Sequence, residues 1–247
     1  MRGQALIMTK YQQGGSVKEI IHAARALFEQ ALAIDPNDPD ALAGVARTYF
    51  SDYYFQSGTT ATDYDAKVIG QADRAIALDP SNVSAHNDKS MYLNSSGRSN
   101  EGLRAADEGL AANPNSAMLH NARAYAEINL GRFEQAKADI FQAMRLSPRD
   151  PAINLWRTNL ADAEMGLGHF DTAIELIRQS IDAGYRVSYT YKELAAAYAL
   201  AGKMDEARTA LAEALRLSPK LTIKWVARTN PVPIVLEGLR KAGLPEE

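Results

Sequence analysis

The sequence predicts an all-α fold in which pairs of helices repeat along the chain. A short apolar-rich stretch that ends in proline recurs five times, closing at Pro36, Pro80, Pro114, Pro148 and Pro219. The intervals are 44, 34, 34 and 71 residues, and the last is close to two intervals of 34. Proline ends a helix because it lacks the N–H that the helical ladder needs. The spacing therefore predicts one helix pair per interval of about 34 residues.

The best-preserved repeat, residues 188–219, shows what each unit contains. It has small residues where two helices approach closely, and a glycine where the first helix ends, because glycine adopts positive φ without a steric clash. With Pro219 as position 32, the residues that carry the pattern are Tyr191, Leu194, Ala195, Tyr198, Gly202, Ala207 and Ala214. The pattern resembles the tetratricopeptide repeat, whose 34-residue unit is two antiparallel helices. The resemblance implies a right-handed α-solenoid of about six helix pairs with a C-terminal capping helix region.

We expect the whole chain, residues 1–247, to form one solenoid domain. Six repeats are predicted, followed by a cap at 220–247, and their bounds are 3–36, 39–80, 83–114, 117–148, 151–185 and 188–219. The first repeat is fragmentary. The second carries an insertion of ten residues, and the fifth has lost its proline and has three extra residues in or before its first helix.

Two segments depart from the repeat pattern. The insertion near residues 57–65 follows an aromatic run over residues 49–55. Either a longer first helix packs on its own loop, or the aromatic side chains form one wall of a ligand pocket. The tail is predicted to form a short helix around Trp225 and a second helix over residues 231–242. A solenoid needs an end unit with a polar outer face, so we expect the tail to cover the apolar face of the last repeat.

Composition excludes several classes of function. Lys and Arg number 27 against 30 Asp and Glu, and the chain has no basic run, so we expect no nucleic-acid partner. The absence of cysteine excludes a disulfide framework, a thiolate zinc site and a cysteine nucleophile. No window approaches the roughly 18 apolar residues of a membrane span, and the apolar start at residues 5–8 is too short for a signal peptide. We therefore expect a cytoplasmic chain that does not insert into membranes.

We expect that the chain is not an enzyme and that it holds no cofactor or metal. It has no phosphate-binding glycine loop, nucleophile elbow or dinucleotide motif. His86 and His120 share position 4 of adjacent repeats, but no third ligand stands at metal-site spacing, which favours packing or surface roles. Acidic pairs such as Asp205 and Glu206 begin helices, where they complement the helix dipole.

The resemblance implies that the first helix of each pair lines a concave groove. The candidate peptide-binding residues at the groove positions are Arg47, Asn87, Met91, Asn121, Tyr125, Asn159, Asp162, Tyr189 and Lys192. Asn87 and Asn121 share position 5 and are expected to stack one repeat apart, where an amide can donate to and accept from a peptide backbone. The alternative is that these residues form only a solvated polar surface. We expect no clamp for chaperone C-termini, because only Asn159 matches the residues that such a clamp requires.

Three functional hypotheses follow. The leading one is a non-enzymatic scaffold that binds a protein or peptide in the groove. The second rests on a resemblance to the C-terminal tetratricopeptide region of bacterial class III adenylate and guanylate cyclases and of related winged-helix regulators, carried by Arg2-Gly3, the motif at 26–36, the elongated second repeat and the ending at 237–246. It implies a regulatory arm whose catalytic domain lies outside this chain. The third is a self-association module, which would make the chain a homodimer.

Overall fold

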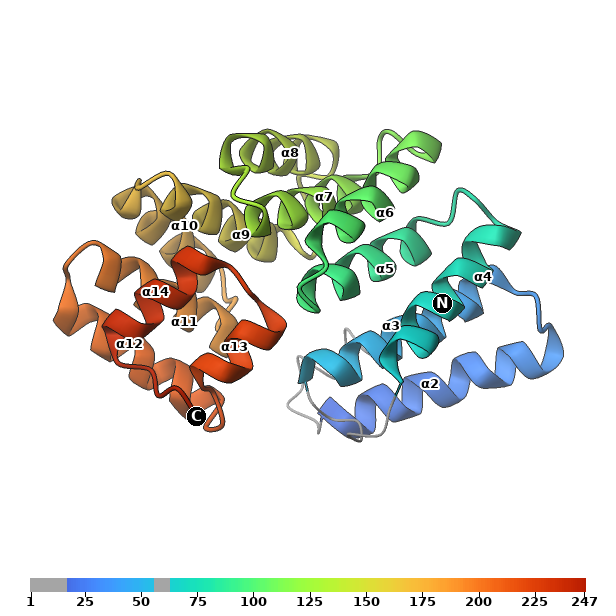
Figure 1. Cartoon of the computed structure of the whole chain (residues 1–247), viewed down its shortest axis with the longest axis horizontal. Helices are drawn as coiled ribbons and strands as arrows, with labels where there is room; N and C mark the ends of the chain where they lie inside the picture. Colours follow the sequence, from blue (N-terminus) through green and yellow to red (C-terminus); the bar gives the residue numbers. More distant parts are fainter. Residues whose placement is uncertain (1–16, 56–62) are drawn as a thin grey trace.

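The structure is a computed structural model of the chain that describes residues 17–55 and 63–247. Those residues contain thirteen α-helices, one short π-helix and no strand, which confirms the predicted all-α class. The elements are α2 (Val17–Ile34), α3 (Pro39–Phe55), η1 (Asp65–Ile69), α4 (Gly70–Leu78), α5 (Val83–Ser95), α6 (Ser99–Ala112), α7 (Ala117–Asn129), α8 (Phe133–Leu146), α9 (Ile153–Gly166), α10 (Phe170–Asp182), α11 (Ser188–Leu200), α12 (Met204–Leu217), α13 (Ile223–Thr229) and α14 (Pro233–Ala242). The helices follow one another along a curved path (Figure 1).

The first helices of the repeats form one continuous layer. The helices α3, α5, α7, α9 and α11 contact one another in series, and we call them the inner helices. Each packs on the second helix of its own repeat, and α6 and α8 also pack on the first helix of the next repeat. This is the stacking of a solenoid, in which each unit buries its apolar face against its neighbours. Two predicted regions, residues 3–16 of the first repeat and 57–62 of the insertion, lie outside the described residues.

Glycine ends the inner helices where the repeat pattern requires it. Gly97, Gly131, Gly168 and Gly202 occupy equivalent positions and have φ between 72° and 80°. After Gly131, the N–H of Arg132 donates to the carbonyl of Glu127 at 2.8 Å, which satisfies a group that the helix end leaves free. In the fifth repeat, where the proline is missing, Gly184 with a φ of 92° follows α10 and performs the same role.

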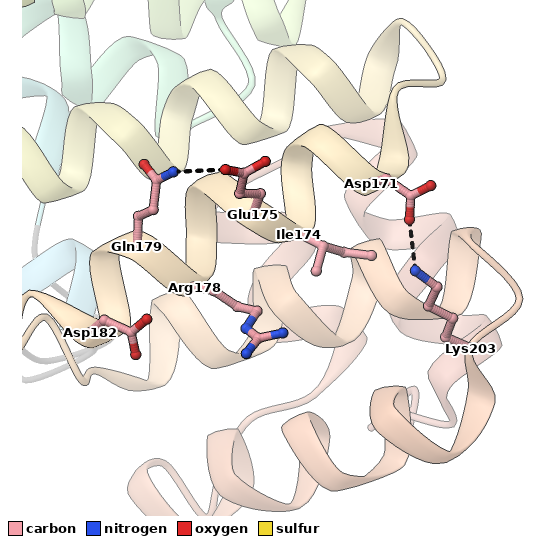
Figure 2. A pocket seen from close by; sticks show the side chains of 7 residues that line it. All are labelled: Asp171, Ile174, Glu175, Arg178, Gln179, Asp182 and Lys203. Atoms are coloured by element: carbon pink, nitrogen blue, oxygen red, sulfur yellow. Dashed lines mark hydrogen bonds and ion pairs between the residues drawn. The ribbon is translucent and has the colours of Figure 1, made fainter.

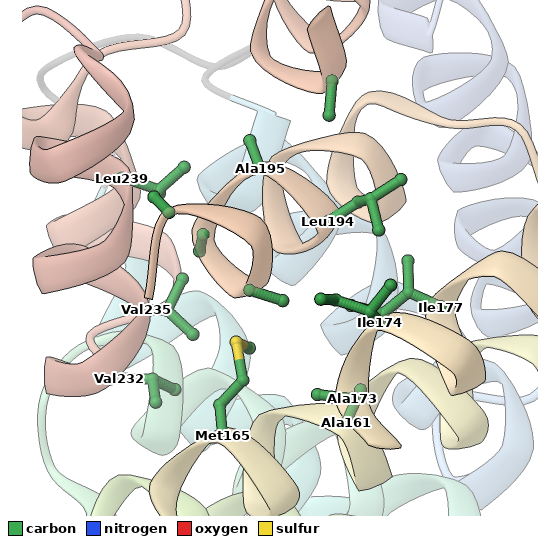
Figure 3. Close-up of a cluster of buried hydrophobic side chains, with 14 of the residues drawn as sticks. Ala161, Met165, Ala173, Ile174, Ile177, Leu194, Ala195, Val232, Val235 and Leu239 are labelled. Atoms are coloured by element: carbon green, nitrogen blue, oxygen red, sulfur yellow. The ribbon is translucent and has the colours of Figure 1, made fainter. Parts of the chain in front are cut away.

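The C-terminal helices cap the last repeat as predicted, and they do so chiefly on its inner helix. α14 packs mainly on α11, also contacts α12 of the same repeat, and reaches back to α9. Val232, Val235 and Leu239, all fully buried, join the core that runs back through the inner helices (Figure 3). Two helices can approach this closely because Gly238 has no side chain. A Cβ there would lie 2.7 Å from the carbonyl oxygen of Ala196. The tail therefore lies on the inner layer.

Candidate peptide-binding site on the inner helices

Five of the predicted groove residues form one network on α7, α9 and α11. Asn159 donates to the side-chain oxygen of Asn121 at 3.0 Å. The hydroxyl of Tyr189 lies 3.2 Å from Asn159 Oδ1 and 3.2 Å from Asp162 Oδ2. The ammonium of Lys192 lies over the ring of Tyr189, 4.5 Å from its centroid. The side chains come from three successive repeats, so stacking of the inner helices alone brings them together.

This part of the inner layer is occupied by the chain itself. Residues 228–233, which we call the crossing segment, comprise the end of α13, the connection 230–232 and the first residue of α14. They bond to the inner helices α3, α7 and α11. Tyr125 donates to Asn230 Oδ1 at 2.9 Å, and Asn230 Nδ2 donates to Glu193 Oε1 at 2.9 Å. Two residues earlier in the chain, Arg228 bonds to α3: Tyr53 donates to the carbonyl of Arg228 at 3.2 Å, and Arg228 donates to the carbonyl of Tyr53 at 3.0 Å. The crossing segment therefore links the second repeat to the sixth.

The charges beneath the crossing segment are buried. Lys192 is 1% exposed, and Asp162 and Glu193 are fully buried. Lys192 pairs with Glu193. Burial raises the pKa of Asp162 well above its ordinary value, and the nearby charge of Glu193 raises it further. Both effects favour the protonated form of the Asp162 carboxyl.

The predicted residues of the second and third repeats form a separate cluster. Arg47 donates through Nε to both carboxylate oxygens of Asp88, at 3.0 and 3.2 Å. Asn87 also donates to Asp88, at 3.1 Å, and Met91 is half-buried. Asn87 and Asn121, which are predicted to stack one repeat apart, have different hydrogen-bond partners: Asn87 donates to Asp88, and Asn121 accepts from Asn159.

Two residues that complete the network are absent from the predicted set. Glu193 stands at position 6 of the last repeat. Position 6 is a groove position, so the repeat pattern could have predicted this residue. Asn230 lies outside the repeats, and no periodic pattern marks it. Its role depends on where α13 and α14 dock, and the sequence pattern does not contain that information.

The two equivalent histidines have structural roles. The ring of His86 lies 3.2 Å from the carbonyl of Ala105 and 3.1 Å from that of Pro80. The ring of His120 lies 3.1 Å from the carbonyl of Pro114 and 2.9 Å from a carboxylate oxygen of the buried Asp139. Each histidine thus joins an inner helix to the second helix of its pair and to the proline turn before it.

The carboxyl group of Glu127 is buried near two other ionised groups. Arg123 on the same helix pairs with Asp139 of α8. Glu127 is 7% exposed, and its Oε2 has no hydrogen-bond partner among the described residues. Burial raises its pKa to about 7, with a further contribution from the charge of Asp139. At physiological pH this group is near its titration midpoint.

We expect Glu127 to make the protein less stable as the pH rises. A carboxyl whose pKa is higher in the folded state favours folding while it is protonated, and this contribution disappears as the pH increases from about 4.5 through about 7. Glu127→Gln stays uncharged, so at pH 8.5 it should be more stable than the wild type by roughly 1–3 kcal/mol. Urea unfolding at pH 5.5 and 8.5 measures the difference. An advantage that is equal at both pH values would contradict the prediction.

Two hollows lie on the described surface. One, of about 380 Å³, runs along α10 and is lined by charged side chains, among which Lys203 and Asp171 pair at 2.7 Å (Figure 2). The other, of about 650 Å³, lies between the end of α3 and α13. Phe55 and Trp225 line it, while Tyr53 packs edge-to-face on Tyr64 and Tyr92. The aromatic run therefore contributes both to packing and to a pocket wall.

Comparison with protein-family models identifies the repeat. A model of the tetratricopeptide repeat matches residues 90–151 and 158–221, which is more than half of the chain. The chain belongs to the tetratricopeptide repeat family. A comparison with curated protein sequences gave no match. Among the helices of residues 17–55 and 63–247, none is both long enough and apolar enough to cross a bilayer.

Solved structures share the fold at low sequence identity. The APC/C hetero-tetramer Cut9–Hcn1 gives a TM-score of 0.68 at 18% identity, covering 90% of this chain and 39% of that one. PilW, a type IV pilus biogenesis factor, gives 0.61 at 17%, covering 81% and 89%. A tetratricopeptide protein from Thermus thermophilus gives 0.55 at 22%, covering 87% and 100%. Our chain thus spans well under half of the first of these chains. At such identities the likeness shows the fold alone.

Proposed function

We propose that this chain is a non-enzymatic scaffold that binds an extended segment of another protein on its inner helices. One observation carries the proposal: the inner helices already bind the crossing segment of the same chain, in which residues 230–232 between α13 and α14 are non-helical. Tyr125 and Glu193 bind the side chain of Asn230, and Tyr53 binds the backbone carbonyl of Arg228. The inner layer therefore offers groups for side chains and for backbone, as a peptide-binding surface must.

The partner is first identified by capturing proteins on the full chain and analysing them by mass spectrometry. Each captured protein is then titrated against the wild type and two variants, one with a substitution in the inner layer and one with a substitution in the outer layer. Met118 on the inner helix α7 is 39% exposed, and Phe141 on α8 is 53% exposed. We expect Met118→Ala to weaken binding roughly tenfold, since losing a buried apolar contact in an interface costs about 1 kcal/mol or more. Phe141→Ala should leave the affinity unchanged. The opposite result, or no change in either variant, would reject the inner layer as the binding surface.

The regulatory arm is a second candidate, favoured by the resemblance of the ending at residues 237–246 to bacterial cyclase-linked proteins. That ending is an ordered part of the fold, because the N–H of Ile223 donates to the carbonyl of Pro245 at 2.8 Å. If the chain is such a regulatory arm, we expect the purified chain to show no turnover of ATP or GTP. We also expect the coding frame upstream of Met1 to encode a catalytic or DNA-binding domain. A ribosome-binding site and start codon at Met1, with no domain in frame before them, would reject the regulatory arm.

A further inference from the structure

The side chain of Asn230 is recognised at both of its ends. Its oxygen accepts a hydrogen bond from Tyr125, and its nitrogen donates one to Glu193, each at 2.9 Å. Asn230 is fully buried. An aspartate in its place would set a second carboxylate against Glu193, and an alanine would leave both partners unpaired. The hydroxyl of Tyr125 and the carboxylate of Glu193 together therefore select an amide side chain.

Two more carboxyl oxygens lie buried beside this amide. Glu193 Oε2 and Asp162 Oδ1 have no donor among the described residues. Besides burial, a hydrogen bond between the two carboxyl groups is one of the causes that raise the pKa of Asp162, so a proton on Asp162 satisfies both oxygens. Pro231 and Pro233 have no N–H to offer, so Asn230 makes the side-chain hydrogen bonds of the segment to α7 and α11, beside a contact of 3.4 Å from the Tyr125 hydroxyl to the carbonyl of Thr229.

We propose that Tyr125 and Glu193 form an amide-binding subsite that the crossing segment occupies as an internal ligand. The partner that displaces it presents an asparagine side chain, followed by proline, on an extended segment. This inference rests on the proposed function, because it assigns a chemistry to the partner of the same surface. The observed contacts with Asn230 define the chemistry, since a competing peptide would have to replace them.

An internal ligand makes a specific thermodynamic prediction. The apparent affinity for a partner is reduced by the fraction of molecules in which the subsite is open. A substitution in the crossing segment therefore strengthens partner binding, because it opens the subsite. A substitution in Tyr125 removes a contact that the internal ligand and the partner share, so it cannot produce that gain. A purely structural contact would show neither behaviour.

The experiment uses the full chain and a synthetic peptide with the sequence of residues 226–234, Val-Ala-Arg-Thr-Asn-Pro-Val-Pro-Ile, blocked at both ends. Fluorescence anisotropy measures its Kd. We expect Asn230→Ala to bind the peptide roughly ten- to a hundredfold more tightly than the wild type, because the variant lacks two internal hydrogen bonds, one of them to a carboxylate. Adding Tyr125→Phe to Asn230→Ala should remove most of this gain.

A second peptide with aspartate in place of the asparagine needs no further protein variant. Asn230→Ala should bind it at least tenfold more weakly than the asparagine peptide, since its carboxylate faces Glu193. Equal affinity for both peptides, or no gain in Asn230→Ala, would overturn the inference. So would a dimer in light scattering that the peptide does not dissociate, because a second copy would then fill the subsite. If partner binding still depends on Met118, the proposed function stands and only this inference fails.

Discussion

Replacing Lys192 by methionine is expected to lower the free energy of unfolding by about 3–5 kcal/mol. The ammonium is 1% exposed, pairs with the fully buried Glu193 and lies over the ring of Tyr189. Its removal leaves a carboxylate inside the protein with no compensating charge. Urea or guanidinium unfolding at neutral pH measures the loss.

Two controls separate this effect from a general cost of losing a lysine. Lys203→Met removes an ammonium that is exposed and pairs with the exposed Asp171, so the stability should be nearly unchanged. The double variant Lys192→Met with Glu193→Met removes both charges of the buried pair and should be considerably more stable than Lys192→Met alone. A single variant that unfolds at the wild-type denaturant concentration would show that the two charges are not buried together.

Replacing Gly109 by leucine is expected to cost roughly 3 kcal/mol, near the upper end for overpacking a core. Gly109 stands at position 27 of its repeat, where the second helix crosses the first. A Cβ there would lie 2.8 Å from both His86 Cβ and Leu119 Cδ1. The ring of His86 lies between the carbonyl groups of Ala105 and Pro80, at 3.2 and 3.1 Å, so it cannot move aside without losing the hydrogen bond that it donates to one of them.

A matched control variant is expected to change the stability in the opposite direction. Gly70 lies at the start of α4, and among the described residues outside its own helical turn no atom comes within 4 Å of the place where a Cβ would stand. Gly70→Ala should therefore stabilise the protein by about 0.5–1 kcal/mol through the lower backbone entropy of the unfolded chain. The two midpoints of thermal unfolding should move in opposite directions. A loss in both variants would mean that helix crossing is not what restricts position 109.

The inner helices show which features of the site the repeat pattern predicts and which it does not. It predicted Asn121, Asn159 and Asp162 on first helices, and these residues lie on α7 and α9. Asn159 bonds to Asn121, and the hydroxyl of Tyr189 joins Asn159 to Asp162. The repeat pattern also led us to expect an exposed groove, whereas Asn121, Asn159 and Asp162 are at most 6% exposed. In this part of the layer α14 packs on α9 and α11, and the crossing segment bonds to Tyr125 and Glu193.

The sequence by itself determined the local features of this protein. The ends of the repeats, the glycines of positive φ and the small residues at helix crossings follow from the conformational limits of single residues and recur at a fixed period, so one chain shows them. Only the tertiary structure decided where the C-terminal helices lie. Their position depends on the backbone of Gly238 meeting Ala196, and on Asn230 fitting between Tyr125 and Glu193. These contacts join residues far apart in the sequence, and they occur once, so periodicity cannot reveal them.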